Sequence, residues 1–173
     1  MLTLLLFKGL MGTGKSTLSQ TVGKKMNWPV LNIDDLADVF VSRQLPDRQA
    51  ACYDILFSVG ESFLKQGFSV ILESSLKGKE GFERGKQLAR TMNAELKVIE
   101  CFCSNETLWR ERLETRPYRP NQLVRNWESF LEYREKALPD FAYKIDCPVL
   151  TVDTARDLET ITSEVVTWLK EVN

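Results

Sequence analysis

The eight residues from Gly9 to Ser16, with the sequence GLMGTGKS, have the types and the spacing that bind a phosphate group. They match the pattern G-x-x-x-x-G-K-[ST], in which glycines let the backbone curl so that successive N–H groups point at one anion. An apolar run at residues 4–7 precedes this loop, and a helix-like segment begins at Lys15. The N-terminus of such a helix adds a partial positive charge. This order of residues predicts a site for the phosphates of a nucleotide.

Individual positions of the loop predict individual roles. Lys15 is expected to reach the β- and γ-phosphates, and the Ser16 hydroxyl is expected to be a ligand of Mg²⁺. The alternative is a glycine-rich turn that a lysine follows by chance, and the strand-loop-helix context makes this the weaker interpretation. The residues that we expect to hold the nucleotide in this loop are Gly9, Gly12, Thr13, Gly14, Lys15 and Ser16.

A general base in this chain must be a carboxylate or another residue, because the sequence contains no histidine. Asp34 and Asp35 directly follow an expected strand and would face the phosphate loop across a cleft. In phosphoryl transfer, accepting the proton of the acceptor hydroxyl is one of the few tasks left to the protein. The alternative is that an Asp caps the helix that follows. Both can hold, with Asp34 as the preferred base and Asp35 as the second candidate.

An acidic residue also ends the third expected strand, at Glu73. Its carboxylate could contact Mg²⁺ through water or orient an acceptor group, and the serines that follow could hydrogen-bond to phosphate or acceptor. The alternative is a solvated strand end without such a role. The candidate acceptor residues are therefore Asp34, Asp35, Arg43, Glu73 and Ser75. Surface ion pairs account for Arg43 equally well.

Five arginines gather in a short stretch of the chain, at Arg110, Arg112, Arg116, Arg119 and Arg125. Arginines can neutralise the negative charge that spreads over a γ-phosphoryl group in the transition state. Arg112 and Arg116 are four residues apart and share a helix face, and two prolines follow that break the helix. We expect residues 110–125 to form a lid. The alternative, a surface helix with Glu–Arg pairs, accounts well for Arg110 and poorly for Arg119.

Alternating strands and helices must position these residues. Short apolar runs predict strands at residues 2–7, 30–33, 69–73, 96–102 and 149–152. Helical patterns occur at residues 15–26, 34–43, 47–66, 79–92, 105–116, 122–137 and 155–170. This alternation predicts an α/β fold with a parallel sheet. Ligands of such sheets bind outside the C-terminal strand ends, so the phosphate loop, the Asp pair and Glu73 would share one rim.

Length and composition indicate one domain, residues 1–173, with one sizeable core. The net charge of -1 implies no bulk attraction to nucleic acid or to an anionic membrane. The four cysteines lack the C-x-x-C spacing of zinc or redox sites, and we interpret them as buried side chains in a reducing compartment. No apolar run approaches the length of a membrane span, and no secretory signal is found, so we expect a cytoplasmic protein.

These parts, in this order, resemble the small P-loop kinases, a group that includes shikimate and gluconate kinases, chloramphenicol phosphotransferase, zeta-toxin-like kinases and the kinase domain of polynucleotide kinase. The resemblance covers nearly the whole chain and rests on residues 9–17, 32–35, 70–73, 112–116 and 152–154. It implies a three-layer P-loop NTPase fold with a five-stranded parallel sheet in the order 2-3-1-4-5. It also implies helices on both faces of the sheet and a small lid.

The resemblance implies roles for single residues as well. It makes Asp34 the base, adds Thr17 to the phosphate loop and places Thr154 near the adenine of ATP. Arg112 and Arg116 would open the lid segment and, with Lys15 and Asp34, would form the catalytic set. ATP and Mg²⁺ are the implied cofactors. Glu73 departs from the Asp that is commoner at its position.

We therefore expect an ATP-dependent kinase that transfers the γ-phosphoryl group to a hydroxyl of a small molecule. A polynucleotide 5′-hydroxyl kinase is the first alternative, but no arginine soon follows Asp34 as one does in the polynucleotide kinases, which argues against a nucleic-acid partner. A non-catalytic ATP-binding switch module is the second alternative, in which ATP would stabilise one conformation without donating phosphate.

Overall fold

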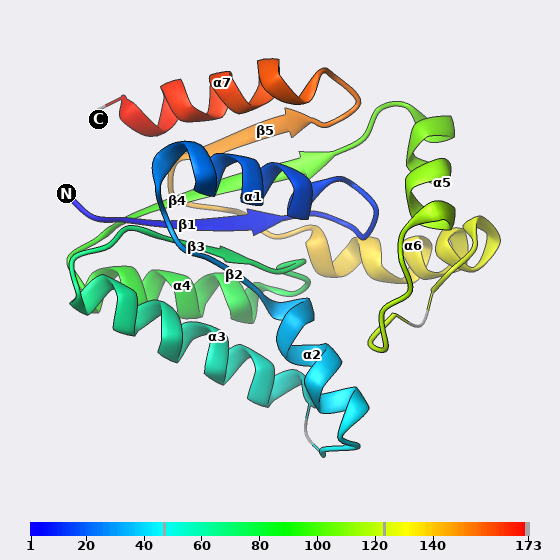
Figure 1. Cartoon of the computed structure of the whole chain (residues 1–173), viewed down its shortest axis with the longest axis horizontal. Coiled ribbons are helices and arrows are strands. Elements are labelled where there is room, and N and C mark those ends of the chain that lie inside the picture. Colours follow the sequence, from blue (N-terminus) through cyan, green and yellow to red (C-terminus); the bar gives the residue numbers. More distant parts are fainter. Residues whose placement is uncertain (47, 123, 172–173) are drawn as a thin grey trace.

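Five short parallel strands form one sheet in the computed structural model, which describes residues 1–46, 48–122 and 124–171. The strands are β1 (Thr3–Lys8), β2 (Val30–Asn32), β3 (Val70–Glu73), β4 (Glu95–Phe102) and β5 (Val149–Asp153). Their order across the sheet is β2-β3-β1-β4-β5, and all neighbouring pairs are parallel (Figure 1). The predicted α/β fold and its strand order are therefore confirmed.

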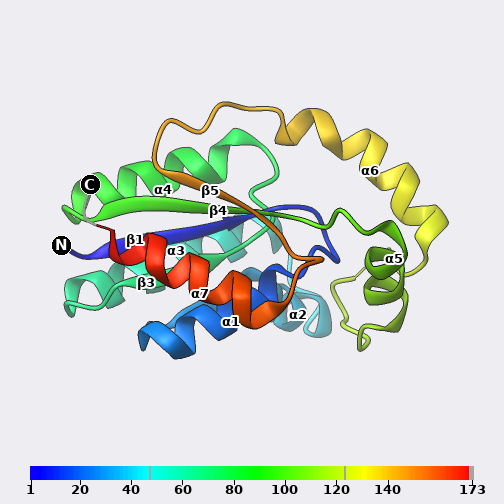
Figure 2. The same ribbon diagram turned by 90° about the horizontal axis from the view of Figure 1, so that it is seen from above.

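Helices cover both faces of this sheet. Helices α1 (Lys15–Met26) and α7 (Leu158–Lys170) pack on one face, and α3 (Arg48–Lys65) and α4 (Lys79–Thr91) pack on the other (Figures 1 and 2). The remaining helices gather at the C-terminal end of the sheet and are α2 (Ile33–Ser42), α5 (Glu106–Thr115) and α6 (Trp127–Phe141). Among the described residues, no helix combines the length and the apolar character needed to cross a membrane.

Alternating side chains of the central strand β1 enter two separate cores. Leu4 and Leu6 pack in the core beneath α3 and α4, whereas Leu5 and Phe7 pack in the core beneath α1 and α7. Successive side chains of a strand point to opposite faces of the sheet. A strand that is covered on both faces therefore needs a continuous apolar sequence, which is the pattern seen in β1.

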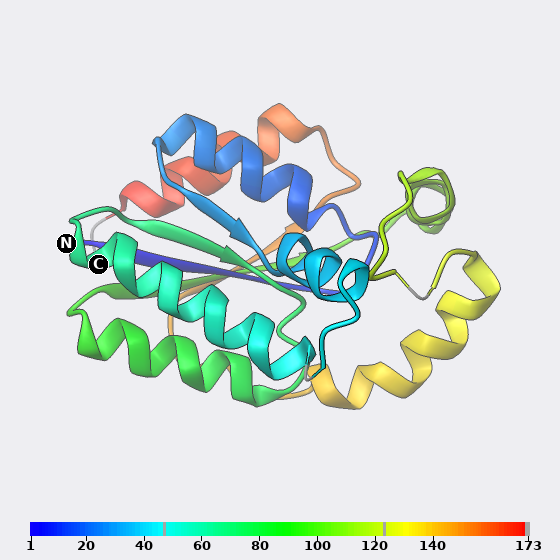
Figure 3. The same cartoon turned by 60° about the horizontal axis from the view of Figure 1, so that its bottom comes forward.

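Helices α5 and α6 lie beyond the tips of the strands (Figure 3). Their side chains form a third, smaller core. Trp109 of α5 packs against both Trp127 and Phe130 of α6, and its ring centroid is 5.0 Å from that of Phe130. The arginine-rich segment that was predicted as a lid spans α5 and the connection from α5 to α6. Aromatic packing thus holds together α5 and α6, the two helices that this connection joins.

Two helices, α6 and α7, have boundaries that differ clearly from the sequence prediction. Helix α6 begins at Trp127 instead of residue 122, because the side chain of Asn126 accepts a hydrogen bond from a backbone N–H and caps the helix there. It also continues past residue 137 to Phe141, with Pro139 in its last turn. Helix α7 begins at Leu158 instead of residue 155, where the preceding aspartate is the cap. Asp47 and Leu123, within the predicted α3 and lid, lie outside the described residues.

Candidate active site

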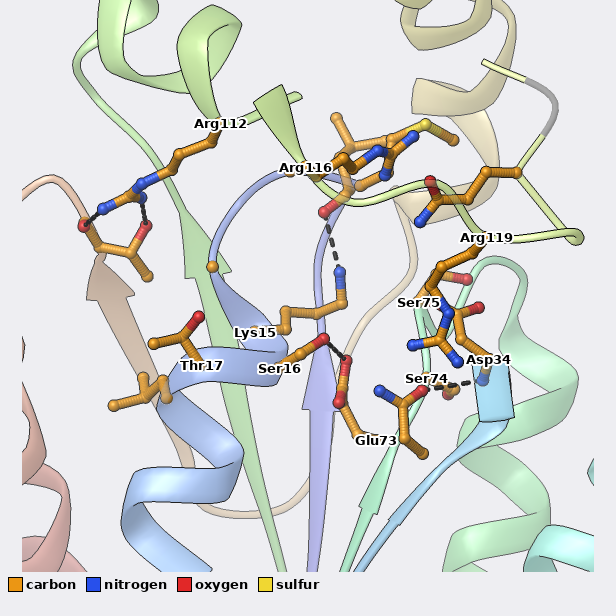
Figure 4. Close-up of a pocket in the computed structure, with 18 of the residues that line it drawn as sticks. Lys15, Ser16, Thr17, Asp34, Glu73, Ser74, Ser75, Arg112, Arg116 and Arg119 are labelled. Carbon is orange, nitrogen blue, oxygen red and sulfur yellow. Dashed lines mark hydrogen bonds between the residues drawn. The ribbon is translucent and has the colours of Figure 1, made fainter. Parts of the chain in front are cut away.

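The phosphate loop connects β1 to α1 and is shaped by glycine (Figure 4). Gly9 has a φ of 145°, and a Cβ atom added there would lie 2.4 Å from the backbone oxygen of Cys101, so a larger residue does not fit. Gly14 also has a positive φ, of 81°, and immediately precedes α1. Because glycine has no side chain to cap the helix, the first N–H groups of α1 stay available to an anion.

Lys15 lies inside its own loop. Its side chain is largely buried, and its Nζ donates a hydrogen bond of 2.8 Å to the backbone oxygen of Leu10. Burial lowers the pKa of Lys15, and the negative charge of Glu73 is the main influence that opposes this shift. The ammonium group is therefore poorly solvated and placed where a phosphate oxygen could replace the Leu10 carbonyl as its acceptor.

Ser16 and Glu73 form a hydroxyl–carboxylate pair beneath the loop. Ser16 Oγ donates to Glu73 Oε1 at 2.8 Å, and Ser19 Oγ donates to Glu73 Oε2 at 3.3 Å. Glu73 is only 3% exposed, and burial raises its pKa, whereas Lys15 and the Ser16 hydroxyl act in the opposite direction. The interpretation of Glu73 as a solvated strand end is therefore wrong. The two side chains present oxygen ligands of the kind that Mg²⁺ prefers.

Asp34 lies in the first turn of α2, across the cavity from the loop. The cap of this helix is Asn32, whose side chain accepts a hydrogen bond of 2.8 Å from the Asp34 backbone N–H. The expectation that one of the two aspartates is the cap is therefore wrong, because the helix begins one residue earlier, at Ile33. Asp34 Oδ1 instead accepts a hydrogen bond of 2.9 Å from Asn121 Nδ2.

Arg112 joins the lid to the phosphate loop through Thr154. Its guanidinium donates to the hydroxyl and to the backbone oxygen of Thr154, at 3.2 and 2.9 Å. The Thr154 hydroxyl in turn contacts the backbone oxygens of Thr13 and Phe102, at 2.7 and 3.0 Å. This chain of contacts fixes the turn after β5 against the loop and holds Arg112 beside it.

Arg116 and Arg119 approach the site from the lid. Arg116 Nη2 donates to the backbone oxygen of Val124 at 2.6 Å, and burial lowers the pKa of Arg116 while the charge of Asp34 raises it. Arg119 forms ion pairs with Asp35 and Asp38 of α2, at 2.5 and 2.7 Å. The charge of Asp34 therefore acts on Arg116, which has no carboxylate partner among the described residues, whereas Arg119 has two.

One cavity of about 1020 Å³ brings most of these groups together. Its lining includes the predicted residues Gly12, Gly14, Lys15, Ser16, Thr17, Asp34, Glu73, Ser75, Arg112, Arg116 and Thr154. Four predicted site residues are outside the lining: Gly9, Thr13, Asp35 and Arg43. The first two shape the loop from behind, Asp35 pairs with Arg119, and Arg43 follows the last residue of α2 and is exposed.

Sequence reasoning missed three residues that support the site. Trp109 Nε1 donates to the backbone oxygen of Met11 at 2.9 Å and so braces the loop from α5. Asn32 caps α2, and Asn121 binds Asp34. The position of Asn32 at the end of a strand and before two acidic residues is a cap signal that could have been recognised. Nothing local in the sequence points to the other two contacts, which join residues about 90 positions apart.

Comparison with solved structures shows the fold. A protein from Chloroflexus aurantiacus that is described as a kinase is 24% identical, with a TM-score of 0.76 and coverage of 96% of this chain and 97% of the other. A gluconokinase from Sinorhizobium meliloti is 18% identical, with a TM-score of 0.64 and coverage of 95% and 90%. The APS kinase CysC of Mycobacterium tuberculosis, in complex with AMPPNP and APS, is 16% identical, with a TM-score of 0.64 and coverage of 98% of each chain.

Comparison with sequences identifies the family. No similar sequence was found among the curated proteins. The model of the family described as "AAA domain" matches residues 4–137, which is more than half of the chain and includes the phosphate loop, Asp34, Glu73 and the lid. The resemblance to small P-loop kinases is thus confirmed at the level of fold, and the chain belongs to the AAA domain family.

Proposed function

We propose that this protein is an ATP-dependent kinase that transfers the γ-phosphoryl group of ATP to a hydroxyl of a small-molecule acceptor. The observation that carries the proposal is that one cavity contains both the phosphate loop with Lys15 and the carboxylate of Asp34. A phosphate cradle alone fits any nucleotide-binding protein, whereas a carboxylate opposite the cradle fits the activation of a hydroxyl. The APS kinase that was solved with AMPPNP, an ATP analogue, supports ATP as the donor.

The binding of the triphosphate would use groups that are already gathered. The loop N–H groups and Lys15 would hold the β- and γ-phosphates, with a phosphate oxygen replacing Leu10 as the acceptor of the Lys15 hydrogen bond. Arg112 and Arg116 would add positive charge where negative charge develops on the transferred group. Thr154, which contacts both the loop and Arg112, would lie beside the nucleotide.

The Ser16–Glu73 pair fits a Mg²⁺ ion, which prefers hard oxygen ligands and keeps several waters. The Ser16 hydroxyl would be a direct ligand, and Glu73 would contact the ion through water. When it is bound, Mg²⁺ neutralises charge on the phosphate oxygens. Ser19, which donates to the second oxygen of Glu73, would keep the carboxylate oriented.

Asp34 would act on the acceptor. Its carboxylate would take the proton of the hydroxyl while the hydroxyl oxygen forms a bond to the γ-phosphorus. The bond between the γ-phosphorus and the bridging oxygen breaks, and ADP leaves with that electron pair. Arg116, whose pKa burial lowers and the charge of Asp34 raises, would stabilise the transferred group beside the base.

A screen for ATP-dependent phosphorylation tests this proposal. The full chain with ATP and Mg²⁺ is offered nucleosides, sugars, antibiotics and a 5′-hydroxyl oligonucleotide, with ADP release and the product mass as readouts. We expect a small-molecule hydroxyl to gain one phosphoryl group in step with ADP release. Phosphorylation of the oligonucleotide alone would overturn the small-molecule acceptor. Tight ATP binding without ADP release from any mixture would instead favour a switch module.

A further inference from the structure

Residues 119–121 of the lid bind the first two turns of α2 through four hydrogen bonds. Arg119 donates to Asp35 Oδ1 at 2.5 Å and to Asp38 Oδ2 at 2.7 Å. The backbone N–H of Asn121 donates to Asp38 Oδ1 at 3.0 Å, and its Nδ2 donates to Asp34 Oδ1 at 2.9 Å. The donors and acceptors are more than 80 positions apart in the sequence, so these contacts join the lid directly to the helix that carries the proposed base.

The contacts with Asp38 and the contact with Asp34 have different roles. Asp38 receives both a side-chain and a backbone donor, and its side chain is 21% exposed, so it anchors the lid segment to α2. The Asn121 side chain is not needed for that anchor, because the backbone N–H of Asn121 and the Arg119 guanidinium supply it. The amide of Asn121 instead donates a hydrogen bond to Asp34, which, unlike Asp35 and Asp38, lines the cavity.

We propose that Asn121 is a positioning residue that orients the Asp34 carboxylate and thereby couples the lid to the base; this inference rests on the proposed kinase function. By holding Asp34 Oδ1, the amide would fix the rotation of the carboxylate and leave the second oxygen to take the proton of the acceptor hydroxyl. The segment that presents Arg116 to the phosphates therefore also presents Asn121 to the base. Closure of the lid and orientation of the base become one event.

The surroundings of Asn121 argue for this role over simple stabilisation. Among the described residues, no group donates to Asn121 Oδ1, which is buried. A buried acceptor without a donor destabilises the folded state, so an amide is a poor choice if packing alone mattered. The amide N–H₂ contact with Asp34 is then the feature that explains an asparagine at this position.

A double-mutant cycle on transfer to an acceptor from the screen tests the coupling. Asn121→Ala keeps the backbone contact with Asp38, and we expect it to lower kcat about tenfold, the equivalent of about 1.4 kcal/mol, with little change in the KM for ATP. In the Asp34→Asn background the same substitution should have no further effect, because its action passes through Asp34. Glu111→Gln, on the exposed side of α5, is the control and should match wild type. The inference would be overturned if the double variant lost kcat by the product of the two single reductions. It would also be overturned if Asn121→Ala kept the kcat of wild type.

A second measurement needs no acceptor and so separates this inference from the proposed function. The side-chain amide signal of Asn121 in a ¹⁵N spectrum is identified by its loss in Asn121→Ala. We expect it to shift in Asp34→Ala and to stay in place in Asp54→Ala, a change on the exposed surface of α3. If the chemical shift of the Asn121 amide were the same in wild type and Asp34→Ala, the contact between the two side chains would be refuted. If the contact is seen but wild-type protein phosphorylates no acceptor, the proposed function fails and the positioning role fails with it.

Discussion

Lys15 and Glu73 place opposite charges in the buried floor of one cavity. Burial lowers the pKa of the lysine and raises that of the glutamate, and each charge opposes the shift of the other. Their nearest polar contacts are the Leu10 carbonyl for Lys15 and two serine hydroxyls for Glu73. Within the described part of the chain, the Lys15 ammonium hydrogen-bonds to a neutral carbonyl alone. A buried cation in this state is well prepared for an anion, since charge-assisted bonds are the stronger kind.

The substitution Lys15→Ala tests the role of Lys15 in binding ATP. We expect the Kd for ATP with Mg²⁺ to rise about 10- to 100-fold, because hydrogen bonds to charged groups contribute about 1.5–3 kcal/mol. Titration calorimetry measures the change. Lys24→Ala, near the exposed end of the same helix, is the matched control and should bind ATP like wild type. Equal affinity in the two variants would contradict the assignment of the phosphate loop.

The sequence was most informative where one local pattern determines both position and role. The phosphate loop is such a pattern, because its glycines, Lys15 and Ser16 are contiguous. Asp34 was placed correctly on the cavity because strand ends of a parallel sheet share a rim. Asn121 could not be predicted, because its partner is 87 positions away and the described residues of the connection from α5 to α6, in which it lies, form no helix or strand from which a direction could be inferred.

Helix α2 shows how an element can aim a functional group. Asn32 ends β2 in extended backbone and caps α2, so the chain passes from strand to helix within one residue. That abrupt change directs the first turn, with Asp34, towards the phosphate loop. The cap is therefore part of the positioning of the proposed base as well as of helix stability.

The prediction for this element compares two cap substitutions. Asn32→Ala should lower the free energy of unfolding by about 0.5–2 kcal/mol and should also lower kcat for phosphoryl transfer. Asp157→Ala removes the cap of α7 and should cost similar stability with kcat unchanged. Urea denaturation and steady-state kinetics measure the two effects. A loss of kcat in both variants, or in neither, would show that the cap does not aim Asp34.

Element boundaries were predicted well inside the sheet and poorly in the lid. All five strands and α1 were found close to their predicted bounds, since buried parallel strands and an amphipathic helix after a glycine have strong sequence signals. The start of α6 was misplaced by five residues because the apolar spacing continues upstream of the cap at Asn126. Local spacing alone does not reveal that Arg119 and Asn121 bind α2 and that Val124 packs against the core of α5 and α6.

At the scale of the whole molecule, one sheet connects two cores with the cavity at its end. The core beneath α1 and α7 includes Cys101, which is 2% exposed and adjoins the phosphate loop through its backbone. Burial raises the pKa of the Cys101 thiol to about 12. The prediction of buried side chains is confirmed for Cys52, Cys101 and Cys103, whereas Cys147 is only half-buried.

This pKa predicts how stability depends on pH. An unfolded thiol ionises near pH 8.5, whereas folded Cys101 stays protonated until about pH 12. Its contribution is therefore fully present below about pH 8.5 and is lost as pH rises towards the folded value. The stability advantage of wild type over Cys101→Ala should narrow between pH 7 and pH 10.5, as measured by urea unfolding under reducing conditions. If the difference in the free energy of unfolding between the two proteins stayed constant over this pH range, the raised pKa of Cys101 would be contradicted.

If Asp34 is the base, its carboxylate serves phosphoryl transfer and not nucleotide binding, and the substitution Asp34→Asn separates these two roles. ATP affinity and transfer to the acceptor are measured on the same preparation, with Asp54→Asn as the control for loss of one surface charge. We predict an unchanged Kd for ATP with Mg²⁺ and a kcat at least about 100-fold lower, while the control resembles wild type. Wild-type turnover in Asp34→Asn would show that Asp34 is not the base.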